Sequence, residues 1–160
     1  MQVWITTVGW QPFAVINPLW AACFYQEFIP KKVLLLNNGY QNPVIRKNVA
    51  EVWQWHLRIL QAYDVEAPTI EVCNANEDDI NSFRRIFEET VKAQEGEEVA
   101  IDMTPGRKFM SSIAMAVAFK NQHFVKKLFY LHLWGQEYQN QPFIKIPLKN
   151  QRLINVLELF

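Results

Sequence analysis

The chain has 160 residues, the usual size of one domain and enough to build a substantial hydrophobic core. Half of its residues are hydrophobic, which argues against intrinsic disorder. Sixteen basic residues balance sixteen acidic ones, and this net charge of zero argues against a protein that tracks long DNA or RNA by phosphate neutralisation. A small anionic ligand held by a few local cations stays compatible with that balance.

The cysteines and the N-terminus restrict the kinds of site and the cellular locations that we expect for this protein. Cys23 and Cys73 are too few for a disulfide framework and lack metal-ligand spacing, so we expect two buried thiols and no metal site. Residues 1–7 lack the basic and apolar regions of a signal peptide, and no apolar run approaches the ~20 residues of a membrane span. These features predict a cytoplasmic protein without a membrane partner.

Strands and helices alternate along the first half of the chain. Residues 3–8 predict a strand. Asn17 followed by Pro18 predicts the start of a helix, because an N-cap before a proline at the first helical position is a common start signal. Residues 33–36 predict a short buried parallel strand, and a second Asn-Pro pair at residues 42–43 opens another helix.

The same alternation continues through the second half. Two more helices are predicted, one from Asn76 to the turn at Gly96 and one over residues 107–120. The remaining predicted strands are residues 69–73, 99–101, 127–133 and 143–148. We expect the last of these to return antiparallel as a hairpin partner, whereas the apolar tail over residues 152–160 receives no assignment.

This order predicts one α/β domain over residues 1–160, a Rossmann-like three-layer sandwich with a mostly parallel sheet and a C-terminal antiparallel hairpin. In such a sheet the chain starts at the centre, winds outward and then crosses back, so the first and fourth strands become neighbours. Ligands bind beyond the carboxyl ends of those strands. Two loops, residues 7–13 and 103–108, are therefore expected to share one crevice.

The second of these loops carries the strongest local signal. Thr104, Pro105 and Gly106 form a tight turn into a helix whose first turn holds Arg107 and Lys108. A helix N-terminus suits an anion, and two cations there are unfavourable to the helix dipole unless an anion joins them. On this pattern alone, a glycine turn with two solvated basic residues remains the alternative.

Several better-known signatures are missing. The first strand is not followed by G-x-G-x-x-G, and the chain has neither a Walker loop nor a serine in a nucleophile-elbow context, so no dinucleotide cofactor is expected. His56 lies on an apolar helix and is expected to be packed rather than catalytic, and His132 is expected to point into a sheet face. Asp102 is expected to be structural, accepting hydrogen bonds from backbone N–H groups of the turn.

An apolar strand that runs into Asp-x-Thr-x-Gly-x-Lys and then a small-residue helix resembles the second motif of the CARF domain, the CRISPR-associated Rossmann fold. In this chain the motif is residues 102–108, followed by Phe-Met-Ser-Ser over residues 109–112. The family's first motif is a short loop with a glycine and small hydroxyl residues after the first strand. Residues 6–10, Thr-Thr-Val-Gly-Trp, are similar to it, and the resemblance covers the whole chain in strand order.

This resemblance implies a homodimer that binds cyclic oligoadenylate, with cyclic tetra-adenylate favoured, in type III CRISPR antiviral signalling. The chain is expected to carry no effector domain, and the arginine–histidine spacing of HEPN ribonucleases is absent. It therefore looks like a ring nuclease, or alternatively like a non-catalytic sensor that acts through a partner protein. Arg107 and Lys108 argue against a third possibility, a structural subunit with a vestigial pocket.

Cleavage would need neither a metal nor a cofactor, because a ribose 2′-hydroxyl can attack its own adjacent phosphodiester and leave a 2′,3′-cyclic phosphate. We assign charge stabilisation first to Lys108 and then to Arg107, and positioning of the 2′-hydroxyl or a phosphate oxygen to Thr7. The ligand-binding residues predicted from the two loops and the second strand's end are Thr7, Gly9, Trp10, Asn38, Met103, Thr104, Pro105, Gly106, Arg107 and Lys108.

The helix after Lys108 predicts the dimer interface. It is apolar or small nearly all round before Lys120, so one face needs a partner other than the sheet. Ser111, Ala114 and Ala118 are expected to allow close approach of a second chain. The alternative is that the chain's own tail covers this helix.

Overall fold

A computed structural model describes all residues 1–160 and shows four α-helices alternating with the strands of one sheet. The strands are β1 (Gln2–Val8), β2 (Lys32–Asn37), β3 (Thr69–Asn74), β4 (Glu98–Asp102), β5 (Val125–Leu133) and β6 (Gln151–Asn155). The helices are α1 (Pro12–Gln26), α2 (Pro43–Ala62), α3 (Ile80–Lys92) and α4 (Lys108–Lys120). None of these helices combines the length and the hydropathy that a membrane crossing requires.

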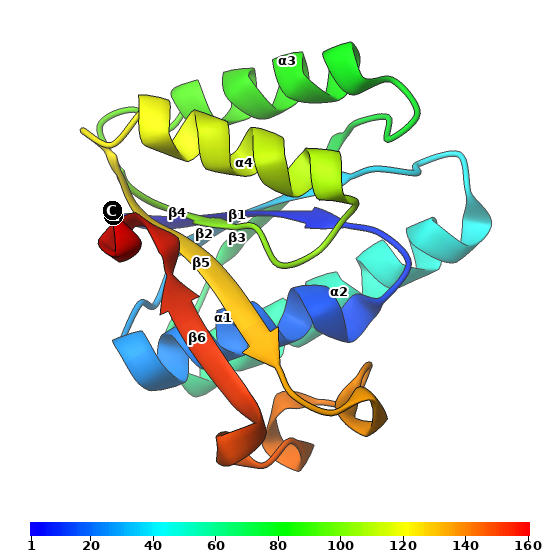
Figure 1. The fold of residues 1–160 in the computed structure, drawn as a ribbon, viewed down its shortest axis with the longest axis vertical. Helices are drawn as coiled ribbons and strands as arrows, with labels where there is room; N and C mark the ends of the chain where they lie inside the picture. Colours follow the sequence, from blue (N-terminus) through cyan, green and yellow to red (C-terminus); the bar gives the residue numbers. More distant parts are fainter.

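The sheet order is β3-β2-β1-β4-β5-β6, with only the last pair antiparallel. This confirms the predicted α/β class and the C-terminal antiparallel pair. Helices α1 and α2 cover one face of the sheet, and α3 and α4 cover the other (Figure 1). Strands β1 and β4 are neighbours in a register that pairs Ile5 with Ile101, so the chain reverses its winding between them. The predicted switch point is therefore present.

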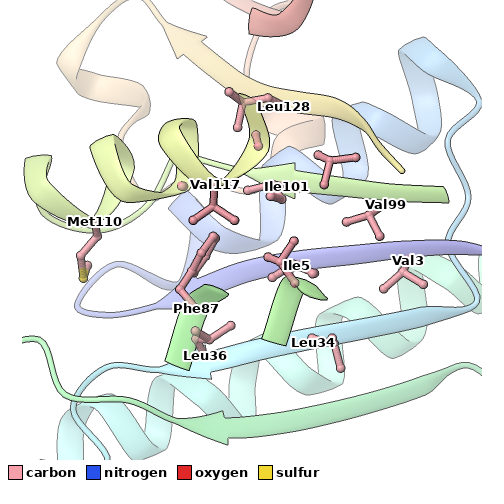
Figure 2. Close-up of a cluster of buried hydrophobic side chains, with 14 of the residues drawn as sticks. Val3, Ile5, Leu34, Leu36, Phe87, Val99, Ile101, Met110, Val117 and Leu128 are labelled. Atoms are coloured by element: carbon pink, nitrogen blue, oxygen red, sulfur yellow. The ribbon is translucent and has the colours of Figure 1, made fainter. Parts of the chain in front are cut away.

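Both faces of the central strands are buried, which explains why they read as continuous apolar runs rather than alternating ones. Ile5 and Ile101 gather with Phe87 of α3 and Val117 of α4 in one core cluster (Figure 2). Trp4, next to Ile5 on β1, points to the opposite cluster under α1 and α2. Two cores of similar size thus hold the sheet between the helical layers.

Helix α1 begins at Pro12 and not at the predicted Asn17-Pro18 pair. Pro18 lies inside the helix. The buried Asn17 side chain serves another purpose, because its amide donates to the Gln141 carbonyl at 2.7 Å and accepts from the Phe143 N–H at 2.9 Å. A long-range clamp therefore uses the asparagine that local rules assign to a helix cap.

The sixth strand is also displaced from its predicted position at residues 143–148. The segment after β5 forms short 3-10 turns at Gln136–Tyr138, Phe143–Lys145 and Leu148–Asn150, and the antiparallel partner of β5 is β6 in the tail. Pro142 precedes the mispredicted segment and Pro147 lies within it, and a proline offers no N–H to a β-ladder.

Helix α4 is more fully covered by its own chain than its composition predicts. Ala114 and Ala118 are buried in the core, and the Ser111 hydroxyl donates to the Met103 carbonyl at 2.9 Å. These three residues therefore do not form an outer contact face, which corrects the sequence prediction. The exposed side chains of the apolar stretch are the small ones, Ser112 and Ala116.

Candidate functional site

The two loops at the switch point are tied together by Asp102, the last residue of β4. Its carboxylate accepts a hydrogen bond from the Thr6 hydroxyl on β1 at 2.9 Å and another from the Thr104 N–H at 2.9 Å. The second bond confirms the predicted structural role of Asp102 in the turn. The first links the neighbouring strands at the point where both loops begin.

Asp102 is only 2% exposed, and this burial raises the pKa of its carboxyl group to about 7. The hydrogen bonds from Thr104 and Thr6 favour the charged form and oppose part of that rise. The turn therefore rests on a carboxyl group that changes its charge near neutral pH.

The turn itself requires glycine at position 106. Gly106 has a φ of +96°, and a Cβ at this position would overlap Met110 Cε and lie 3.3 Å from Thr7 Oγ1. The Thr104 hydroxyl accepts a hydrogen bond from the Leu131 N–H at 2.9 Å and so fixes the turn to β5. The close packing at Gly106 and the hydrogen bond from β5 to Thr104 therefore fix the backbone that leads into α4.

The loop after β1 is held from the opposite helical layer. The Asn48 amide of α2 donates to the carbonyls of Gly9 at 2.9 Å and Trp10 at 3.1 Å. Asn48 is 8% exposed, whereas Trp10 is 55% exposed. The loop backbone is therefore fixed while the indole stands free at the edge of the crevice.

Helices α1 and α4, which begin at the crevice, differ from α2 and α3 in the capping of their N-termini. The Asn42 side chain caps α2, and α3 is capped by Asp79, the last residue of the predicted capping group over residues 76–79. The N-cap residues of α1 and α4 form no side-chain hydrogen bond to their helices, although Asn140 accepts from the Phe13 N–H of α1 at 3.4 Å. Uncapped N–H groups and the positive end of the helix dipole suit an anion, and these two helices start on either side of one crevice.

A cavity of about 340 Å³ lies between the two loops. Six of the predicted ligand-binding residues line it: Gly9, Trp10, Thr104, Pro105, Gly106 and Arg107. The fold therefore brings the two motifs together from positions almost a hundred residues apart.

The other four predicted residues lie around this cavity. Thr7 is 4% exposed with its hydroxyl beside Gly106, and Met103 packs against the core under α4. Lys108 is exposed as the first residue of α4. Asn38 lines a neighbouring cavity at the end of β2.

Arg107 reaches across the crevice to Glu77, which sequence reasoning did not select. Their side chains form an ion pair with an N–O distance of 3.4 Å. The side chain of Arg107 is 57% exposed and that of Glu77 only 11% exposed. Glu77 lines both the switch-point cavity and the Asn38 cavity, and it is the only carboxylate in the wall of the former. It holds the guanidinium over the crevice and partly neutralises it.

Asn48 and Glu77 differ in how visible they are in the sequence. Asn48 interrupts the apolar stripe of α2 between Ile45 and Val49, and a polar residue on a buried stripe is a detectable signal. Glu77 belongs to an acidic run before α3 and carries no mark that separates it from Asp78.

The histidines and cysteines stay outside the site. His56 is fully buried, which confirms its packed role and lowers the pKa of its imidazole to about 4. His132 is half-buried against Tyr130 on β5. Cys23 is buried as predicted, and Cys73 on the edge strand only partly so.

Comparison with known proteins decides the family. Residues 26–159 match the Card1 CARF domain. The chain belongs to the CARF family. The matched residues include the 102–108 turn and leave out the 6–10 loop, which is assigned to the crevice by the structure alone. Membership of this family implies binding of cyclic oligoadenylate in type III CRISPR signalling.

Among solved structures, protein VC1899 from Vibrio cholerae matches 81% of this chain with a TM-score of 0.55 and 13% sequence identity. At this identity the likeness concerns the fold alone. The chain covers 30% of the length of that protein. No curated protein sequence matches the chain.

The raised pKa of Asp102 predicts a pH-dependent effect of Asp102→Asn on stability. Because the folded carboxyl group binds a proton up to about pH 7, whereas an unfolded one loses it near 3.8, this residue destabilises the fold as pH rises between these values. We expect the free energy of unfolding of Asp102→Asn, relative to the wild type, to increase by roughly 2 kcal/mol from pH 5 to pH 8 in urea titrations.

His56 also makes stability depend on pH, because its lowered pKa makes the free energy of unfolding rise with pH over a similar range. This contribution is present in the wild type and in each variant, so it cancels when their free energies of unfolding are subtracted. Asp64→Asn, at an exposed position with a φ of 68° that asparagine tolerates, is the matched control. An equal pH trend in both variants would show that the Asp102 carboxyl group is not perturbed.

The ion pair between Arg107 and Glu77 predicts that Glu77→Gln tightens the binding of an anionic ligand. Removing the carboxylate leaves Arg107 uncompensated, so affinity for the 2′-deoxy analogue of cyclic tetra-adenylate should rise about fivefold at low salt and less at high salt. Titration calorimetry measures this change. Glu66→Gln removes the same charge from an exposed position outside both cavities, and an equal gain there would mean that the pair with Arg107 is irrelevant.

Proposed function

We propose that this CARF domain is a ring nuclease that binds cyclic tetra-adenylate across a homodimer and cleaves it without a metal. The observation that carries the proposal is the crevice itself, where the N-termini of α1 and α4 and the Arg107 side chain surround a cavity between the two family-like loops. Anions bind at such helix N-termini through backbone N–H groups and the helix dipole.

The proposed reaction uses a nucleophile that the substrate supplies. A ribose 2′-oxygen attacks the adjacent phosphorus, the bond from phosphorus to the 5′-oxygen breaks, and the 2′ proton leaves. The departing 5′-oxygen takes up a proton, so the products are linear oligoadenylates with a 2′,3′-cyclic phosphate and a 5′-hydroxyl. The protein needs to hold the three reacting atoms in line and to stabilise the charge on the phosphoryl oxygens.

In this proposal the charged groups divide the work. Arg107 contacts a phosphate from the cavity wall after exchanging its carboxylate partner Glu77 for the ligand. Lys108, exposed at the start of α4, stabilises the charge that develops at the scissile phosphate. Thr7, with its hydroxyl beside Gly106, positions the 2′-hydroxyl or a phosphate oxygen.

The remaining predicted residues shape and extend the site. Gly9, Thr104 and Pro105 form the cavity wall, and Met103 supports the turn from the core. Trp10 offers an exposed indole on which an adenine can stack.

The dimer is part of the proposal because a cyclic tetranucleotide has its own two-fold symmetry, which a pair of identical crevices would match. We place the interface along α4, whose exposed Ser112 and Ala116 permit close approach of a partner helix and whose first residue is Lys108. Two copies of Lys108 then face opposite phosphates of one ring.

The nuclease activity is tested by incubating the purified chain with cyclic tetra- and hexa-adenylate in EDTA and separating the products by chromatography. We expect linear products with a 2′,3′-cyclic phosphate from the tetramer and about a tenfold or larger loss of rate in Lys108→Ala, with unchanged stability. Lys120→Ala, at the other end of the same helix, is the control and should cleave normally.

Each outcome of this assay is informative. Tight binding without products identifies a sensor that signals through a partner protein and overturns the nuclease. A Lys108→Ala variant that melts several degrees lower and still cleaves at the wild-type rate would make the lysine structural.

The dimer is tested by light scattering at micromolar concentration with and without ligand. We expect twice the 18.9 kDa mass of one chain, and a single-chain mass for Ala116→Glu, which places a charge in the middle of the proposed interface. Ala50→Glu, on the exposed side of α2 in the other helical layer, should remain dimeric. A wild-type mass of one chain in the presence of ligand rules out the shared site.

A further inference from the structure

The side chain of Asn38 has no partner in the folded chain. Asn38 follows β2 and is 1% exposed, and neither its amide oxygen nor its amide nitrogen forms a hydrogen bond. Its backbone is fully engaged, since its N–H donates to the Val8 carbonyl at 3.3 Å and its carbonyl accepts from the Glu77 N–H at 3.1 Å. An unsatisfied buried amide weakens the fold, so a structural role does not account for it.

The other asparagines around it do have structural roles. Asn37 accepts from the Gly39 N–H at 3.3 Å and Asn42 caps α2. Asn76 accepts from the N–H of a following residue at 2.9 Å in a turn. Among these asparagines, only Asn38 has a side chain without a hydrogen bond. Its amide is therefore available to a ligand from outside the chain.

Asn38 is one of the residues that line a cavity of about 190 Å³ between the turn at residues 39–42 and the loop at residues 75–78. Glu77 lines both this cavity and the switch-point cavity, so the two adjoin along the same edge of the sheet. A ligand whose phosphate lies at Arg107 can therefore place a neighbouring group here. The side chains of Tyr40 and Asn76 are exposed in the wall of this cavity. Wall side chains of this kind must shift before a group of the ligand can reach the buried amide of Asn38.

We propose that this cavity is an adenine subsite and that Asn38 determines the base specificity of the site. The inference rests on the proposed ligand and deepens it. A carboxamide offers one donor and one acceptor side by side, and adenine presents the complementary pair, its 6-amino group next to a ring nitrogen. Binding then satisfies both orphaned atoms of Asn38 at once.

If Asn38 serves ligand binding, its replacement should leave stability equal or higher and weaken binding. Replacement of a structural asparagine would instead lower stability. Asn38→Leu keeps the branch at Cγ and the number of side-chain heavy atoms and removes the unsatisfied amide, so its melting temperature should equal or exceed that of the wild type. Its affinity for the 2′-deoxy analogue of cyclic tetra-adenylate should fall about tenfold in titration calorimetry. Asn74→Leu, at the end of β3 and outside the cavity, should bind normally.

A second ligand tests the base contact directly. We expect the wild type to bind the matching cyclic tetramer of purine nucleotides, which lacks the 6-amino group, about tenfold more weakly than the adenine ring. Asn38→Leu should not discriminate between the two rings. If this variant fails to fold, equal binding of both rings by the wild type overturns the proposal on its own.

The possible failures are distinguishable. A wild type that binds neither ring overturns the proposed function itself. A wild type that prefers the adenine ring, together with an Asn38→Leu variant that keeps the same preference, leaves the function standing and overturns the role of Asn38.

Discussion

A buried carboxyl group at the end of β4 is the constraint on which the crevice depends. Asp102 joins the Thr6 hydroxyl of the neighbouring strand to the Thr104 N–H of the following turn, so one side chain sets the strand ends and the start of the turn together. Burial disfavours its charged form, as the raised pKa shows. The direction of the backbone after Asp102 decides where Gly106 and Arg107 lie.

The crevice also shows how a chain with zero net charge can offer an anion site. The N-termini of α1 and α4 supply partial positive charge from the backbone, and Arg107 adds a full charge at the cavity wall. Glu77 balances that charge while the site is empty. Specificity for a charged ligand therefore depends on local placement, and composition carries no trace of it.

The architecture and the position of the crevice follow from local patterns in the sequence. Alternating strand and helix patterns are local, and a parallel sheet whose two faces are both covered is the arrangement that buries them. The adjacency of β1 and β4 follows from that order, so the order of the elements is enough to place the loops at residues 7–13 and 103–108 in one crevice. The turn at residues 102–108 was also readable, because glycine and helix-start chemistry act within a few residues.

Which distant groups meet depends on the packing of the complete fold. Local rules assigned Asn17 to a helix cap, but its side chain clamps a loop more than a hundred residues away. Strand β6 formed in the unassigned tail, whereas the predicted segment contains Pro147, which cannot donate to a β-ladder. The pairing of Glu77 with Arg107 and the idle amide of Asn38 were equally invisible. Hydrogen-bond partners far apart in sequence leave no periodic pattern, and packing of the complete fold selects them.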